Sequence, residues 1–418
     1  YAYMNYYGEG IPINKKEASI YLEMAAENEN FDAMTTYALM FYNGDYVDVD
    51  KKRALNYFRT AANNGNPIAM NYYALYLKNG EGIIKINNEK AIKYFKMAIE
   101  KENSDAMLNY ALMLKNGIGI DSNIAEAIKY LKMAIEKRNS DAMLLYSQML
   151  DQGDGVDINK EESLKYLIMS AELNNPKAMY KYGTLLENGD IVPIDKHKAI
   201  MYYKKSAIKG DENAKNQLSS ISQEELFEFS KKEAQNGNAD EMFNYAIMLY
   251  NGQGTSVDKQ KAAKYFIKSA KKGNIDAMFN YALMLYNGDG IETNKEEAAK
   301  YYKLAADNGC ADAMYYYAIM LDKGIGITAN SKEAISYYKM AADQGNIESM
   351  YQYGLLLYNG TGVDVNYEEA VNYFKQAGCK GHLKAFFNFA VMLLNGQGIS
   401  TDKEFAAEIF KYIADYGD

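Results

Sequence analysis

The chain has 418 residues, 48% of them hydrophobic, a formal net charge of −9 and only two cysteines. The acidic balance argues against nucleic acid as a partner, and no run approaches the ~18 apolar residues of a membrane helix, which argues against direct membrane insertion. Cys310 and Cys379 alone cannot form a disulfide framework or a thiolate zinc site, so a reducing, cytoplasmic location is the expectation.

A repeat of about 36 residues runs along the whole chain. Its small marker residue recurs as Ala33, Ala69, Ala106, Ala142, Ala178 and Ala214, and after an interruption as Glu241, Ala277, Ala313, Ser349 and Ala385. A period of this length is typical of stacked two-helix units that bury a continuous core between neighbours. The sequence therefore predicts an all-α, right-handed α–α superhelix (solenoid) of about twelve helix-turn-helix repeats, the first one incomplete.

Residues 275–308 show the two helices expected in each repeat. Met278, Tyr281 and Leu285 share one face of the first helix, which is apolar nearly all round and should belong to an inner layer. The second helix has an apolar face marked by Tyr302 and a charged stripe opposite, so it should be amphipathic and face outward.

The connecting stretch NGDGIETNKEEA, residues 287–298, contains paired glycines and acidic residues, as a calcium or phosphate loop does. Glycine recurs at the position of Gly288, which indicates a left-handed helix end. Asn or Asp recurs at the position of Asn294, and Asn294 with Glu297 resembles a reciprocal capping box. Calcium needs oxygen ligands at other spacings and phosphate needs a free helix N-terminus. The loop is therefore predicted to be a cap, with no metal and no cofactor.

The repeat is interrupted once, because the spacing from Ala214 to Glu241 is nine residues short of the period. The intervening segment lacks the double-glycine loop, and Ser222 with Glu225 has the pattern of a helix cap. Both ends of the chain are expected to be cut edges, since neither has the polar outer face of a terminal repeat. The expected organisation is an N-terminal array over 1–212, a shortened atypical repeat over 213–240 and a C-terminal array over 241–418.

These repeats resemble the Sel-one-like repeat (SLR), a relative of the tetratricopeptide repeat. The resemblance is carried by Ala277, Tyr281–Ala282, Gly288-x-Gly290, Ala298, Tyr301–Tyr302 and Ala305–Ala306. It implies a tetratricopeptide-like α-solenoid and a scaffold or adaptor that binds other proteins. Cysteine-rich relatives reported to act on β-lactams carry a cysteine pair in each repeat, which this chain lacks, so that activity is not expected.

The third residue of each first helix should face the inner surface, and it differs between the two halves. In the later half these residues are aromatic: Phe243, Phe279, Tyr315, Tyr351 and Phe387. Seven residues further along the same face of three of these helices lie Tyr250, Tyr286 and Tyr358. Asn244, Asn280 and Asn388 directly follow three of the five aromatic residues. In the earlier half the third positions are Thr35, Asn71, Leu108, Leu144 and Tyr180, and the far ends are Lys78, Lys115, Asp151 and Glu187.

Two interpretations of the aromatic line stay open. The rings could fill gaps between neighbouring helices, or they could form a groove that holds an extended or helical peptide, with amides bonding its backbone. If a partner uses the groove, we expect binding to centre on the later half.

Nothing in the sequence predicts a catalytic residue. His197 and His382, the only histidines, fall near helix caps and are expected to be solvated surface residues, and no nucleophile and base share a suggestive spacing. The leading hypothesis is a non-catalytic scaffold or adaptor for a protein or peptide partner. The alternatives are a substrate-recruiting subunit of an endoplasmic-reticulum quality-control ubiquitin ligase, located in the lumen, a structural rod in a large assembly and, least favoured, an enzyme. The sequence leaves the oligomeric state open.

Overall fold

The computed structural model describes residues 1–8, 10, 13–80 and 85–416, and every regular element in these ranges is an α-helix. The helices form two compact units, Tyr1–Ser220 and Ile221–Asp418. Unit 1 contains α1 (Ala2–Tyr7), α2 (Lys15–Glu27), α3 (Phe31–Asn43), α4 (Lys51–Asn63), α5 (Pro67–Asn79), α6 (Asn88–Glu100), α7 (Ser104–Asn116), α8 (Ile124–Glu136), α9 (Ser140–Gln152), α10 (Lys160–Glu172), α11 (Pro176–Asn188), α12 (Lys196–Ile208) and α13 (Glu212–Ser220). Unit 2 contains α14 (Gln223–Gln235), α15 (Ala239–Asn251), α16 (Lys259–Lys271), α17 (Ile275–Asn287), α18 (Lys295–Asp307), α19 (Ala311–Lys323), α20 (Ser331–Asp343), α21 (Ile347–Asn359), α22 (Tyr367–Cys379), α23 (Leu383–Asn395) and α24 (Lys403–Tyr416).

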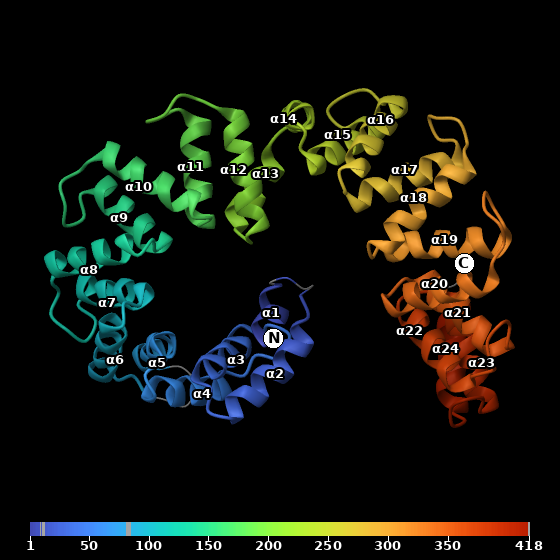
Figure 1. Cartoon of the computed structure of the whole chain (residues 1–418), viewed down its shortest axis with the longest axis horizontal. Helices are drawn as coiled ribbons and strands as arrows, with labels where there is room; N and C mark the ends of the chain where they lie inside the picture. The colour runs from blue at the N-terminus through green and yellow to red at the C-terminus, as the bar shows by residue number, and fades with distance from the viewer. Residues whose placement is uncertain (9, 11–12, 81–84, 417–418) are drawn as a thin grey trace. The chain divides into compact units, whose positions relative to one another are not determined.

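Within each unit, every helix packs against the helix before it and the helix after it (Figure 1). An odd-numbered helix and the even-numbered helix that follows it make one repeat. This consecutive pairing, with no strand in the described ranges, confirms the predicted all-α repeat solenoid.

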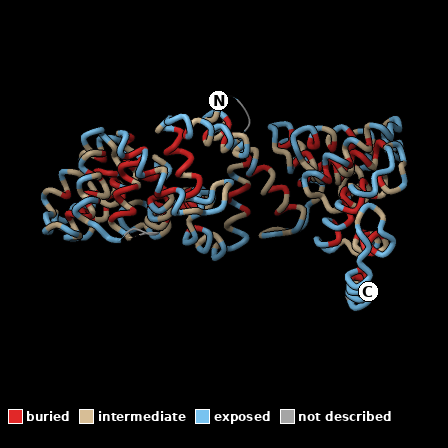
Figure 2. The backbone as a smooth tube through the Cα atoms, turned by 90° about the horizontal axis from the view of Figure 1, so that it is seen from below, coloured by how far each residue is buried: buried red, intermediate tan, exposed pale blue. Residues whose placement is uncertain are grey.

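The two helices of a repeat are buried to different extents. In α17, buried residues such as Met278, Tyr281 and Leu285 spread around much of the helix. In α18, Tyr302 and the buried alanines occupy one face, while Lys300 is exposed on the other. Figure 2 shows the result, with buried stretches of helix alternating with exposed loops along the tube. The difference agrees with the predicted apolar first helix and amphipathic second helix.

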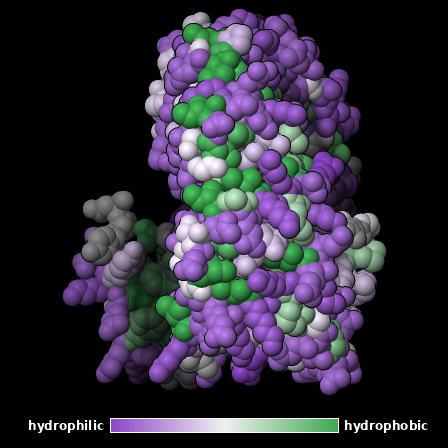
Figure 3. Space-filling model, turned by 90° about the vertical axis from the view of Figure 1, so that its left-hand side faces the viewer, coloured by the Kyte–Doolittle hydropathy of each residue, from purple (hydrophilic) through white to green (hydrophobic). Residues whose placement is uncertain are grey.

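Apolar side chains also reach the surface in places. Figure 3 shows the side of unit 1 at the left of Figure 1, where hydrophobic patches lie among a mostly hydrophilic surface. Scattered surface hydrophobic residues of this kind are normal in folded proteins and do not by themselves mark a binding site.

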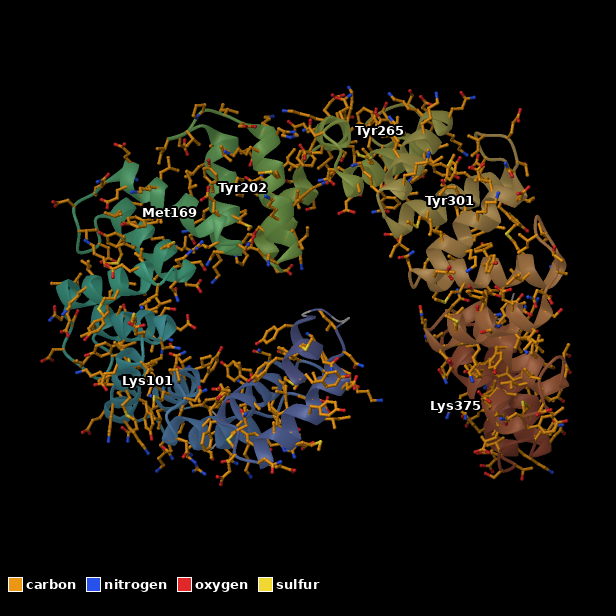
Figure 4. The ribbon with its side chains drawn as sticks, viewed as in Figure 1. Lys101, Met169, Tyr202, Tyr265, Tyr301 and Lys375 are labelled. Carbon is orange, nitrogen blue, oxygen red and sulfur yellow. The ribbon has the colours of Figure 1, made fainter. Side chains whose placement is uncertain are left out.

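Pairs of tyrosines hold the two helices of a repeat together. Tyr265 and Tyr301, labelled in Figure 4, come from one recurring position of the second helices α16 and α18. Tyr265 meets Tyr245 edge-on with the ring centroids 4.7 Å apart, and Tyr301 meets Tyr281 edge-on at 4.9 Å. Edge-to-face contacts add stability beyond the buried area, which explains why this tyrosine pair recurs.

The stretch NGDGIETNKEEA turns the chain as predicted. Gly288 ends α17 in the left-handed conformation, with φ of +71°. Gly290 also has a positive φ, of +76°, and a Cβ placed there would lie 2.3 Å from the Cβ of Lys259 in the preceding repeat. At position 290 glycine is therefore favoured both by backbone conformation and by the close approach of the loop to α16, although Tyr46 adopts a φ of +71° at the equivalent position of another repeat.

Asn294 caps α18, but not through the reciprocal bond expected of a capping box. The Glu297 N–H donates to Oδ1 of Asn294 at 3.0 Å, as predicted. The Glu297 carboxylate accepts from the side-chain amide of Asn294 at 3.3 Å instead of from its backbone N–H. That N–H is already used, because it donates to the carbonyl of Leu285 at 3.0 Å. The loop is thus anchored at both ends by hydrogen bonds.

Asp289 in the same loop fastens its repeat to the preceding one. Its carboxylate accepts a hydrogen bond from the Tyr250 hydroxyl and forms an ion pair with Lys259 at 2.7 Å. Lys259 also lies over the Tyr250 ring, 4.8 Å from its centroid. The hydrogen bond from Lys259, followed by that from Tyr250, holds the pKa of the Asp289 carboxyl below its usual range. The acidic residue of the loop is therefore part of an inter-repeat clamp.

A second inter-repeat contact links the N-terminal caps of successive first helices. The capping Asn accepts from its own helix and donates through Nδ2 to an Asp 34 residues earlier. We call this series of Asn–Asp bonds the cap ladder. Its members are Asn66–Asp32 (2.7 Å), Asn139–Asp105 (2.7 Å), Asn175–Asp141 (2.8 Å), Asn274–Asp240 (2.9 Å) and Asn346–Asp312 (2.7 Å). Each bond satisfies the cap amide while joining two neighbouring repeats.

The interruption of the repeat lies where the chain passes from unit 1 to unit 2. Helix α13 has only nine residues, and two residues separate it from α14. The Glu225 N–H donates to the Ser222 hydroxyl at 3.2 Å, so the predicted cap is present. The segment without the double-glycine loop therefore forms a short first helix and a two-residue turn.

Candidate functional site

Each of the five aromatic residues predicted to face the inner surface is the fifth residue of its first helix and packs against a ring of the second helix in its own repeat. All of these contacts span 23 residues. The pairs and their centroid distances are Phe243–Phe266 (5.8 Å), Phe279–Tyr302 (5.8 Å), Tyr315–Tyr338 (6.2 Å), Tyr351–Phe374 (6.1 Å) and Phe387–Phe410 (5.5 Å). The rings therefore contribute to the packing of unit 2.

These rings are not fully buried. Phe243, Phe279, Tyr315 and Tyr351 are half-buried, and Phe387 is 49% exposed. Burial raises the pKa of the Tyr315 hydroxyl, so this side chain is uncharged at neutral pH. We call the five residues the ring surface. They combine ring packing with partial solvent exposure, so the two interpretations of the sequence are compatible.

The three aromatic residues predicted at the far end of the line lie in the seams between repeats. Tyr250 belongs to the clamp with Asp289, and this hydrogen bond, followed by burial, raises the pKa of its hydroxyl. Tyr286 lies under the ammonium group of Lys295, which is 3.5 Å from the ring centroid. Tyr358 donates to the side-chain oxygen of Gln397 at 3.4 Å. The Tyr286 ring also lies 6.5 Å from the Tyr316 ring of the next repeat, so all three residues contact a neighbouring repeat.

The flanking asparagines also have structural surroundings. Asn244, Asn280 and Asn388 are all half-buried. The Asn280 amide donates to the carbonyl of Asp276 in the preceding turn of its own helix, at 2.8 Å. One of the two amide hydrogens of Asn280 is thus used within α17.

His382 is not a solvated surface residue, so that prediction was wrong. Its side chain is only 10% exposed, and Nδ1 accepts from the Ala385 N–H at 3.0 Å as the cap of α23. The imidazole lies against the Tyr351 ring at 4.4 Å, and Nε2 is 3.5 Å from the Glu348 carboxylate. The residue occupies the position of a cap-ladder asparagine, and the ring is buried because it substitutes for that amide.

Cys310 also occupies a cap-ladder position, where it makes no side-chain cap bond. Burial raises the pKa of the thiol, which disfavours the thiolate form. In the described part of the chain, no three His, Cys, Asp or Glu side chains are grouped to hold a metal ion. No helix there is long and apolar enough to cross a bilayer.

The profile of the Sel1 repeat matches eleven segments of the chain: 1–30, 32–66, 67–103, 104–139, 140–175, 176–211, 242–274, 275–310, 311–346, 347–382 and 387–418. The chain belongs to the Sel1 repeat family. Between the segments, the longest stretch without a match is 212–241, which contains the shortened repeat. Sel1 repeat proteins, like tetratricopeptide proteins, generally mediate protein–protein interaction and are generally non-catalytic scaffolds.

Three solved structures illustrate what the chain is similar to. The protective antigen c5321 of uropathogenic Escherichia coli, which has an SLR fold, is 26% identical, with a TM-score of 0.41 over 96% of this chain and 80% of its own. A Sel1 repeat protein from Oxalobacter formigenes is 22% identical, with a TM-score of 0.44 over 82% of this chain and 90% of its own. Yeast Tom70 is 15% identical, with a TM-score of 0.32 over 93% of this chain and 92% of its own. No curated protein sequence matches the chain.

Proposed function

We propose that this Sel1 repeat protein is a non-catalytic adaptor that binds a peptide or protein partner over the ring surface of unit 2. The observation that carries the proposal is the set of five aromatic residues that recur at one first-helix position and remain partly exposed. Rings already held by packing lose little conformational freedom when a partner covers their exposed part, so they suit the role of binding anchors.

The ring surface favours a protein over other ligands. Its rings are spaced by whole repeats, and therefore extend along several helices, as an extended or helical peptide requires. The net charge of −9 disfavours nucleic acid. Both cysteines are free thiols, which supports a cytoplasmic location over the endoplasmic-reticulum lumen.

The proposal is tested by placing charge on the exposed edges. The variant Phe387→Glu with Phe279→Glu should reduce affinity for a purified partner, first identified by cross-linking and mass spectrometry, at least tenfold. The matched control is Leu108→Glu, which puts the same charge at the same half-buried first-helix position in unit 1.

Circular dichroism and urea unfolding establish that the variants are folded before binding is compared. Equal affinity for wild type and the folded double variant would contradict the proposal. So would an equal loss with Leu108→Glu, because the effect would then not depend on the ring surface.

A further inference from the structure

Unit 1 contains a pocket of about 290 Å³ between α9, α10 and α11. Its walls combine apolar side chains such as Leu167 and the Tyr180 ring with the polar side chains of Asp151, Lys181 and Asp190. The three helices are consecutive and pack together, so the pocket is built into a single seam between repeats.

Two other seams between repeats fill the same space with three rings of their own. The corresponding residues are Tyr42, Phe58 and Tyr72 in α3–α5, and Tyr286, Tyr302 and Tyr316 in α17–α19. In both sets the second and third rings are stacked, with centroids 4.9 and 5.2 Å apart. At the pocket these three positions are Asp151, Leu167 and Lys181, and all three line it. The pocket therefore lies where this fold elsewhere packs aromatic side chains.

We infer that this pocket accepts the side chain of a tyrosine from a protein partner, an inference that rests on the interaction role proposed above. The ring of that tyrosine packs on Leu167 and beside Tyr180, in the space that the chain's own rings occupy in other repeats. Tyrosine is among the residues most often used as an interface anchor, because it buries a large rigid ring while its hydroxyl finds a polar partner.

Asp190 supplies one acceptor for the hydroxyl. It occupies the loop position of Asp45 and Asp289, and each of those accepts from a tyrosine hydroxyl of the preceding repeat, Tyr6 at 2.7 Å in the first case and Tyr250 in the second. At the pocket, Asp151 replaces that tyrosine, and Lys160 pairs with Asp151 at 2.6 Å. The partner's phenol restores the missing donor to Asp190.

The next repeat shows the same chemistry with the other carboxylate. There, Tyr203 stands at the position of Leu167, and its hydroxyl donates to the Glu187 carboxylate at 2.7 Å. Glu187 stands at the position of Asp151. A phenol over Leu167 thus has a second acceptor in Asp151, which favours tyrosine over phenylalanine.

The floor of the pocket can be covered by a ring without leaving a polar atom unpaired. Ser147 and Ser163 replace the alanines of other repeats, and both are buried. The Ser163 hydroxyl donates to the carbonyl of Ser147 at 2.8 Å, and the two hydroxyl oxygens are 3.1 Å apart. Because these groups satisfy each other, burial under an apolar ring adds no desolvation penalty for them.

The test uses the full chain and three small probes, N-acetyl-tyrosinamide, N-acetyl-phenylalaninamide and N-acetyl-argininamide, titrated at millimolar concentrations by NMR. We expect the tyrosine probe to perturb methyl signals of Leu164, Leu167 and Leu185. We expect at least fivefold weaker binding of the phenylalanine probe and no binding of the arginine probe. Preferred binding of the arginine probe, or no binding of the tyrosine probe, would overturn the inference.

Two variants locate the binding. Lys181→Tyr places a ring at the position that Tyr72 has in α5, and should weaken binding of the tyrosine probe at least tenfold. Lys181→Ala, the matched control at the same exposed position, should leave it unchanged. If the probe binds Lys181→Tyr as well as it binds wild type, the site lies elsewhere and the inference is wrong. These titrations need no partner, so their outcome is independent of whether the ring surface of unit 2 binds one.

Discussion

Replacing Cys310 by Asn should stabilise unit 2, because it restores the cap ladder at a position where it is broken. Helix α19 begins at Cys310 without a side-chain cap bond. At the same position one repeat earlier and one repeat later, Asn274 and Asn346 cap their helices and also donate to Asp240 and Asp312. The partner that an asparagine at position 310 would need is present as Asp276.

The expected gain is the sum of two contributions. A capping asparagine contributes about 0.5–2 kcal/mol relative to a residue that cannot cap. The bond to Asp276 adds about 0.5–1 kcal/mol, at the low end for a charged acceptor because Asp276 is exposed. Together they should stabilise the unit by about 1–2 kcal/mol after the half-buried thiol is lost.

Urea unfolding measures the global effect, and amide hydrogen exchange locates it. The amide of Ala313, which the new side chain would bond, should exchange about 5–30 times more slowly. Cys310→Ala is the matched control, since it removes the thiol without adding a cap. Adding Asp276→Ala to the asparagine variant should remove the part of the stabilisation that comes from the bond to Asp276. An asparagine variant no more stable than the alanine variant would refute the reasoning.

The remaining predictions concern single side chains of unit 2. Asn294→Ala should lower the free energy of unfolding by about 0.5–2 kcal/mol, because it removes the cap of α18, and calcium titration followed by circular dichroism should give no response in either protein. Tyr302→Phe should raise the free energy of unfolding by about 1 kcal/mol, since the buried hydroxyl has no hydrogen-bond partner among the described residues. If urea unfolding instead shows a decrease of about 1 kcal/mol or more, the hydroxyl is hydrogen-bonded and the reasoning is wrong. Asp289→Asn should lower the free energy of unfolding by about 0.5–1 kcal/mol at pH 7, a modest value because the clamp is partly exposed. Lys259 and Tyr250 hold the folded-state pKa of Asp289 below its unfolded value, so the cost should be constant above about pH 5 and shrink as pH falls through the folded-state pKa; unfolding curves between pH 7 and pH 3 measure it, and a cost that grows on acidification would contradict the sign.

The helices and their caps could be predicted from the sequence because they depend on residues close together in the chain. Apolar spacing in α17 and the cap at Asn294 each involve no more than a few turns of one helix. One detail of the cap was predicted wrongly, namely the bond from the backbone N–H of Asn294 to the Glu297 carboxylate. The backbone N–H of Asn294 is taken by Leu285 in the preceding helix, and this depends on how two helices meet.

Contacts between repeats were harder to predict, although their residues recur visibly. The clamp at Asp289 joins residues 30 and 39 positions apart, and the cap ladder joins residues 34 apart. A sequence period shows that such residues are equivalent, but it does not show which equivalent sets touch. For the same reason, spacing alone could not decide how far Phe387 or Phe279 is exposed.

The pocket in unit 1 shows the limit most clearly. In the sequence, Asp151 is one of four charged residues in the earlier half, with Lys78, Lys115 and Glu187, at a position that is tyrosine in several other repeats. Whether neighbouring side chains fill the space beside Asp151 depends on packing between three helices. Leu167 and Lys181 do not fill it, and a pocket remains.

The clamp at Asp289 has a consequence for how such a chain can change length. Its partners lie in the repeat before, at fixed separations, and the loop passes so close to Lys259 that position 290 favours glycine. Duplicating or deleting one whole repeat keeps these separations across the seam. Gaining or losing part of a repeat shifts all of them at once. Lineages that descend from this chain should therefore grow and shrink in whole-repeat steps, with partial losses tolerated only where, as between α13 and α14, the loop itself has been removed.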